Sequence, residues 1–199
     1  MTIYVLPVYP VRERKQNHMK ATGIVRRIDD LGRVVIPKEI RRTMRIREGD
    51  PLEIYTDSDG EVIFKKYSPL GELNTFSTQY AEVLYRNSGF PVVVCDRDHV
   101  IAVAGIPKKE LIERRVSPML EDKMEQRKTF VCDMTGTDKL QPVEGVDRYA
   151  VVGAPIISSG DVCGSIMLMS DGAATEQSSE VSVKLINTAA AFLGKQMEE

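Results

Sequence analysis

The chain has 199 residues, of which 42% are hydrophobic and 28% are charged, and its net charge is −2. This composition is typical of a globular protein of one or two domains and excludes a disordered tail, a collagen and a disulfide scaffold. The apolar stretches are strand-sized, which excludes membrane insertion. The three cysteines, Cys95, Cys132 and Cys163, are odd in number and far apart. They predict a reducing, cytoplasmic compartment and no metal site.

Residues 1–18 differ from the sequence that follows them. Their apolar run, residues 3–11, contains Pro7 and Pro10 and leads into a basic segment, unlike a signal peptide. Regular patterning begins at Met19. We therefore expect residues 1–18 to be an extension outside the fold.

Positive charge is concentrated in one segment. Residues 20–47 carry nine basic and three acidic side chains, a net charge of +6, and seven of the nine are arginines. Arginine presents a planar fork of five donors that suits phosphate groups and base edges. The segment therefore predicts a nucleic-acid surface, with a solvated basic face as the alternative. Residues 67–199 carry a net charge of −6, which argues against nucleic-acid binding there.

Alternating apolar positions and turn residues predict a β-β-α-β-β order in the N-terminal part. The expected elements are strands at 21–29 and 33–36, a helix at 37–44, and strands at 52–56 and 61–66. Asp30-Leu31-Gly32 supplies the first turn, and Pro37 suits the first position of the helix. A unit this short buries too little surface to be stable alone, so it must dimerise or pack against the rest of the chain.

The C-terminal part predicts a sheet with helices. Expected helices cover 72–87, 108–115, 119–127 and 177–197, and expected strands cover 90–95, 99–104, 129–134, 149–157 and 162–169. The first and last helices each carry an apolar seam. With the N-terminal part, these elements predict an α+β protein.

The sequence from Met19 to Met44 resembles the AbrB-type transition-state regulators of spore-forming bacteria. The hallmark is Gly32-Arg33-Val34-Val35-Ile36-Pro37, followed by Glu39 and Arg41-Arg42. The resemblance covers residues 19–70. It implies a dimer in which hairpins of two chains interleave into one small barrel. It also implies control of late, forespore-stage sporulation genes, as activator and repressor, on the nucleoid.

The same resemblance implies that basic residues of the strands and the helix bind double-stranded DNA. These are Arg26, Arg27, Arg33, Arg41, Arg42 and, as a further candidate, Lys20. Arg45 and Arg47 are open to two interpretations, because they can contact phosphate or pair with Glu48 or Glu53.

Residues 89–199, with residues 71–88 as linker and first helix, resemble a GAF domain, a fold that senses small molecules in many regulators. The chain lacks the Asn-Lys-x-Asp motif of cyclic-nucleotide binders, so we expect no such ligand and leave the ligand unidentified. The seams at 72–87 and 177–197 predict that this domain assembles subunits into a dimer of dimers.

Two other functions compete with a regulator. Antitoxins share the small barrel but usually continue into a short disordered tail, whereas a long patterned segment follows here. A GAF-fold enzyme with cysteine redox chemistry is the other alternative, but Cys95 and Cys163 lie in apolar strands, as inert buried thiols do. His99 beside Asp96 and Asp98 is interpreted as a hairpin-turn histidine. We expect no catalytic residue.

Overall fold

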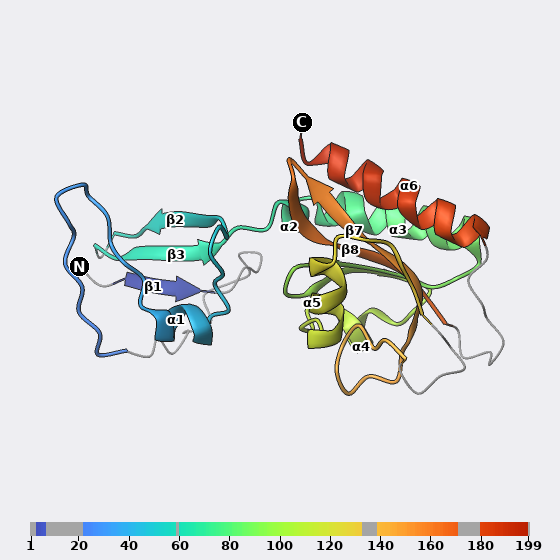
Figure 1. The fold of residues 1–199 in the computed structure, drawn as a ribbon, viewed down its shortest axis with the longest axis horizontal. Coiled ribbons are helices and arrows are strands. Elements are labelled where there is room, and N and C mark those ends of the chain that lie inside the picture. The colour runs from blue at the N-terminus through green and yellow to red at the C-terminus, as the bar shows by residue number, and fades with distance from the viewer. Residues whose placement is uncertain (1–2, 7–21, 59, 133–138, 171–179, 199) are drawn as a thin grey trace. The chain divides into compact units, whose positions relative to one another are not determined.

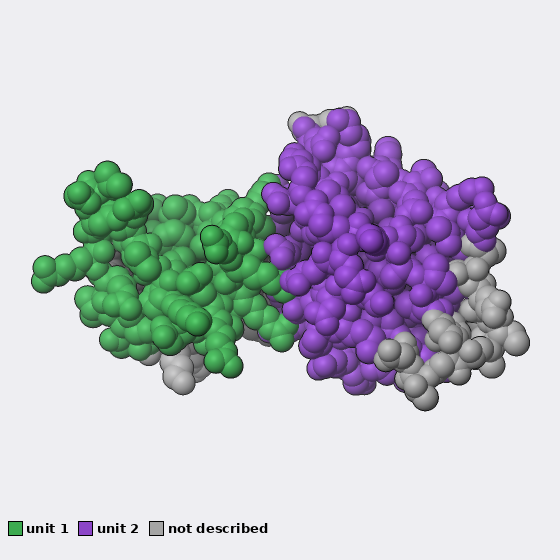
Figure 2. All heavy atoms as spheres, in the orientation of Figure 1, with its two compact units in different colours: residues 1–67 green, residues 68–199 purple. Residues whose placement is uncertain are grey.

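The computed structural model describes residues 3–6, 22–58, 60–132, 139–170 and 180–198. The chain divides into two compact units, unit 1 (Met1–Tyr67) and unit 2 (Ser68–Glu199), coloured separately in Figure 2. Each unit combines helices with a sheet, which confirms the predicted α+β class. None of the helices among the described residues has the length and apolar character that crossing a membrane requires.

Unit 1 contains a three-stranded sheet and one short helix (Figure 1). Strand β3 (Val62–Lys66) lies between β2 (Leu52–Thr56), which is antiparallel to it, and β1 (Ile3–Leu6), which is parallel. Helix α1 (Lys38–Thr43) precedes β2. Residues 1–18 were expected outside the fold, whereas four of them pair with β3. The edge of β3 that β2 does not cover is open for pairing, and residues 3–6 are of types that favour strands, which accounts for this pairing.

The segment before α1 differs from the sequence prediction. Residues 22–36 were expected to form two strands, but they contain only the tight turn between Asp29 and Arg33. Most of their apolar side chains are exposed, with Val25 at 85% and Val35 at 70%, whereas Val34 and Ile36 are half-buried. A strand requires a neighbour for its backbone hydrogen bonds, and the described residues of one chain supply none for residues 22–28.

Unit 2 is built on a five-stranded antiparallel sheet of order β5-β4-β8-β7-β6. The strands are β4 (Val92–Asp96), β5 (Val100–Ala104), β6 (Phe130–Val131), β7 (Ala150–Ser158) and β8 (Asp161–Met169). The predicted hairpins 90–104 and 149–169 are therefore present. Ser159 and Gly160 join β7 to β8 with φ of 49° and 87°, as a two-residue type I′ turn requires.

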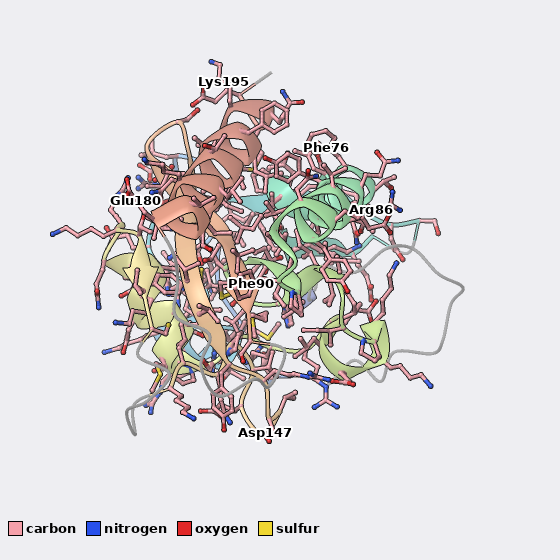
Figure 3. The ribbon with its side chains drawn as sticks, turned by 90° about the vertical axis from the view of Figure 1, so that its right-hand side faces the viewer. Phe76, Arg86, Phe90, Asp147, Glu180 and Lys195 are labelled. Carbon is pink, nitrogen blue, oxygen red and sulfur yellow. The ribbon has the colours of Figure 1, made fainter. Side chains whose placement is uncertain are left out.

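Helices cover both faces of this sheet. Helices α3 (Asn74–Ser88) and α6 (Glu180–Gln196) lie side by side on one face, where Figure 3 labels Phe76 on α3 and Glu180 and Lys195 on α6. Helices α4 (Lys108–Leu111) and α5 (Pro118–Glu125) lie on the other (Figure 1).

Each face of the sheet has its own apolar core. Val92 and Val94 of β4 belong to the core under α3 and α6, whereas Val93 and Cys95 belong to the core under α4 and α5. A strand that is buried on both faces needs a continuous apolar run, which explains why β4 shows no polar alternation.

Three expected elements have different bounds. Helix 108–115 ends at Leu111, because Glu113 takes a φ of 63° and the next residues pair with Val100 at the edge of β5. Strand 129–134 is reduced to Phe130–Val131, and its last two residues lie outside the described residues. The start of helix 177–197 also lies outside them.

Unit 2 begins at a capped helix. Ser68 is the N-cap of α2 (Pro69–Glu72), where its hydroxyl accepts the Gly71 N–H at 3.0 Å. The same hydroxyl donates to Asp96 Oδ2 at 3.0 Å. This contact fixes the first residues of unit 2 against the end of β4.

Candidate nucleic-acid interface

The turn that carries Arg33 is organised by Asp29. Asp29 Oδ1 accepts the backbone N–H groups of Leu31 and Arg33 at 3.0 and 2.8 Å. Its Oδ2 pairs with Arg33 Nε at 2.8 Å. Gly32, with φ of 76°, takes the left-handed position that the turn requires. The backbone N–H of Arg33, followed by its guanidinium, holds the pKa of Asp29 below its usual value.

The Arg33 guanidinium is hydrogen-bonded on its Nε side, and its side chain is largely exposed. Arg33 Nε donates to the Asp29 carboxylate, and the Arg33 side chain is 68% exposed. Of the five N–H donors of a guanidinium, four are on the two Nη atoms. Arg33 is therefore arranged to present Nη donors to an anion.

Helix α1 carries Arg41 and Arg42 at consecutive positions. It starts after Pro37, whose fixed φ suits a helix start. At its end Arg45 takes a φ of 50°, and the Ile46 N–H donates to the Arg41 carbonyl at 2.7 Å, which closes a Schellman motif. Arg42 is exposed, and Arg41 is partly buried with its Nε unpartnered among the described residues.

Lys66 fixes the end of this helix to the sheet. Its Nζ donates to the Arg45 carbonyl at 3.1 Å and lies 3.7 Å from Asp50 Oδ2. The same Asp50 oxygen accepts the Arg47 N–H at 2.8 Å. The side chains of Lys66 and Asp50 are 17% and 4% exposed, so this ion pair is shielded from solvent. It couples the position of α1 to β3.

The remaining predicted DNA contacts come from the segment without regular strands. Arg26 and Arg27 are both exposed. Lys20 lies outside the described residues. All five described arginines of the predicted set therefore belong to unit 1, with Arg41 and Arg42 on one helix and Arg33 in the turn before it.

The candidate groups of unit 2 have structural partners. Asp96 Oδ1 accepts the N–H groups of Asp98 and His99 at 2.8 and 2.7 Å, so this carboxylate shapes the β4–β5 turn. His99 itself pairs with Arg115 through a backbone bridge. These contacts agree with the interpretation of His99 as a turn residue.

The cysteines lie where a thiolate is unfavourable. Burial raises the pKa of Cys95, and burial raises the pKa of Cys132 to about 11. Burial also raises the pKa of Cys163. A redox thiol requires the opposite shift, because the thiolate is the nucleophile.

Two family models match the chain, one in each unit. Residues 72–198 match the stage V sporulation protein T C-terminal model, described as a transcription factor. Residues 25–71 match the model of the antidote-toxin recognition protein MazE, a bacterial antitoxin.

Known proteins give the same division. Stage V sporulation protein T of Bacillus subtilis is 51% identical over 185 residues, which cover 91% of this chain and 100% of that protein. The N-terminal DNA recognition domain of the Bacillus subtilis regulator AbrB is 65% identical over 26% of this chain and 94% of that domain, with a TM-score of 0.23. A GAF domain of a phosphotransferase from Coxiella burnetii is 17% identical over 63% of this chain and 82% of that domain, with a TM-score of 0.50.

Together the matches define a class, a transcription factor with an AbrB-like N-terminal domain and a GAF-like C-terminal domain. Within that class, the chain belongs to the stage V sporulation protein T family. The resemblance to AbrB-type regulators is thereby confirmed, as is the GAF-like fold of the C-terminal part.

The sequence prediction missed two residues of the site. Asp29 and Lys66 hold Arg33 and α1 in place, yet neither was singled out. The spacing of Asp29 and Arg33 across a glycine turn was a usable signal, since an Asp four residues before an Arg can close such a turn with its own side chain. The contact of Lys66 with Arg45 spans 21 residues, and no local pattern predicts it.

Proposed function

We propose that this protein binds double-stranded DNA through the arginines of unit 1 and regulates transcription as both activator and repressor. Its targets are late, forespore-stage sporulation genes. The single observation that supports this most is the arrangement of Arg33, Arg41 and Arg42 at a tight turn and on an adjacent helix. Their sequence context is that of the AbrB DNA recognition domain.

The proposal includes a dimer. Unit 1 leaves Ile24, Val25, Ile28 and Val35 exposed, and a small domain rarely leaves that much apolar surface open to water. Residues 22–28 also require strand partners. A second chain that interleaves its own segment 22–36 would cover the apolar side chains and complete the strands. The arginines of two chains would then lie on one barrel.

Binding of a short DNA duplex, followed by fluorescence anisotropy on the full chain, tests the proposal. We expect the double variant Arg41→Ala/Arg42→Ala to lower affinity at least tenfold, since each lost phosphate contact weakens binding on any sequence. The matched control is Lys108→Ala/Lys109→Ala, which removes the same charge from exposed positions of α4 in unit 2. The proposal fails if both double variants weaken binding equally.

For unit 2 we propose two roles, assembly of dimers into larger oligomers and response to a small molecule. The support is the GAF-like fold together with the exposed apolar face of α3 and α6. Mass spectrometry of denatured, freshly purified protein tests the second role. A co-purified small molecule supports it, and its reproducible absence leaves assembly as the role of the domain.

An antitoxin is the second candidate, because residues 25–71 match an antitoxin model. That match ends where the C-terminal model of the sporulation family begins. Co-expression with a histidine-tagged copy separates the two candidates. An antitoxin would carry a small toxin through purification in a fixed ratio, whereas a regulator would not.

A further inference from the structure

This inference rests on the proposed DNA-binding function. We propose that Asp29 is a positioning residue for DNA. It holds the guanidinium of Arg33 by its Nε, so that the Nη donors are already oriented when they meet a backbone phosphate.

Asp29 uses both carboxylate oxygens within its own turn. Oδ1 accepts two backbone N–H groups, from Leu31 and Arg33, and Oδ2 accepts Arg33 Nε. Rotation of the carboxylate would break all three hydrogen bonds. Asp29 is therefore a rigid anchor for the base of the Arg33 guanidinium, in contrast to an ordinary surface ion pair between two mobile side chains.

The arrangement is local and does not depend on a second chain. The turn is closed by backbone hydrogen bonds from Asp29 to Arg33 and from Gly32 to Asp29, both of 3.0 Å. Every contact lies between residues 29 and 33. Pairing of the flanking segments with a partner would leave these bonds in place.

Asp29 has two opposing effects on DNA binding. Its charge repels phosphate, which weakens binding to any duplex. Its hydrogen bond with Nε already restricts the Arg33 side chain before binding. Arg33 therefore loses less conformational freedom on binding, which strengthens the affinity for DNA. Asp30 has only the first effect: it is the next residue along the same turn, is exposed, and makes no hydrogen bond or ion pair with Arg33 among the described residues.

The matched substitutions are Asp29→Asn and Asp30→Asn in the full chain. Each removes one negative charge. In Asp29→Asn the amide oxygen can still accept the turn N–H groups, whereas its NH₂ group cannot accept from Nε. Affinity for a short duplex is measured for wild type, for both variants, and for both variants in an Arg33→Ala background.

We expect Asp30→Asn to strengthen binding by removal of repulsion. Asp29→Asn should bind about fivefold more weakly than Asp30→Asn, a factor consistent with the cost of ordering part of an arginine side chain. In the Arg33→Ala background the two variants should bind alike, because the group that Asp29 positions is gone.

Two results would overturn the inference. Equal affinities of Asp29→Asn and Asp30→Asn in the presence of Arg33 would show that only charge matters. If the affinities of Asp29→Asn and Asp30→Asn differed by the same factor in the Arg33→Ala background, Asp29 would act through the turn itself and not through Arg33. A wild-type protein that binds no duplex would instead refute the DNA-binding function, which is a separate and recognisable outcome.

Discussion

At the scale of single residues, the ionisation of the cysteines separates a regulator from a redox enzyme. Burial raises the pKa of Cys132 to about 11 and also raises the pKa of Cys95 and Cys163. Each thiol is therefore protonated near neutral pH in the folded protein and deprotonates more readily once the chain unfolds.

Alkylation of the native protein with iodoacetamide tests this. The rate at Cys132 should rise with pH and reach half its maximum near pH 11, and Cys95 should react only after unfolding. Because the folded pKa of Cys132 is raised above its ordinary value of 9.0, its contribution to stability should decline between pH 9.0 and about 11. Half-maximal alkylation of Cys132 near neutral pH would contradict the account and favour redox chemistry.

The arginines proposed to bind DNA show what a sequence can and cannot specify at this scale. Charge and residue type singled out the basic segment, and the resemblance to AbrB-type regulators singled out Arg33, Arg41 and Arg42 within it. Their supports are harder to predict. Asp29 acts through a turn geometry that only its spacing from Arg33 signals, and Lys66 contacts Arg45 across 21 residues of sequence, which no local pattern predicts.

At the scale of elements, strands that pair within one chain were predicted well, in unit 2 and at 52–56 and 61–66 of unit 1, whereas the strands expected at 21–29 and 33–36 are not formed by the described residues. The β7–β8 hairpin follows from two apolar runs and a Ser-Gly turn, which are local signals. Residues 22–28 show the same alternation but do not form a strand in one chain. Sequence patterns predict which residues favour a strand, whereas the presence of a partner decides whether it forms.

The packing of α6 on β7 depends on one glycine. A Cβ at Gly194 would lie 2.2 Å from the Ile157 carbonyl oxygen, which is fixed in the sheet. Alanine normally stabilises a helix relative to glycine by roughly 1 kcal/mol. Here the clash should dominate, and Gly194→Ala should lower the free energy of unfolding of unit 2 by about 1–3 kcal/mol.

Urea unfolding followed by circular dichroism measures this change. Thr188→Ala is the control, since Thr188 is exposed on the same helix and should be neutral or slightly stabilising. If Gly194→Ala were as stable as that control, α6 would pack less closely on β7 than described.

Helices α3 and α6 share an aromatic cluster, which we propose as part of a subunit interface. The rings of Phe76, Tyr80 and Phe192 have centroids 5.4–6.3 Å apart, and Phe192 is 42% exposed. We expect Leu73→Glu/Phe76→Glu to lower the mass of the oligomer by about half, from a dimer of dimers to a dimer.

Light scattering measures the mass, and circular dichroism checks that unit 2 stays folded. Met119→Glu is the control, because Met119 is 40% exposed on α5, on the opposite face of the sheet, and should leave the mass unchanged. An unchanged mass in the folded double variant would place the interface elsewhere.

At the scale of the whole molecule, the proposed function makes unit 1 depend on a second copy. Its core is small: Ile46, 8% exposed, is the one large hydrophobic side chain that is buried among the described residues of unit 1. A domain of this size rarely buries enough surface to be stable alone. Two chains that share one barrel would bury more apolar surface than either chain buries alone.

Sedimentation of the isolated fragment 19–70 tests the dependence. We expect a dimer at micromolar concentration, with a loss of folded structure on dilution because folding and association are linked. A fragment that is folded and monomeric at that concentration would refute the interleaved dimer.

The central claim is that arginines of unit 1 bind DNA mainly through its phosphates. The most direct measurement is the affinity of the full chain for specific and unrelated duplexes over a range of salt concentrations, for wild type and Arg33→Ala. The log-log slope should be about −0.9 per neutralised phosphate. Arg33→Ala should weaken binding to both duplexes alike and flatten the slope by about one unit. A loss confined to one sequence, at unchanged slope, would contradict the account and replace phosphate contact with base recognition.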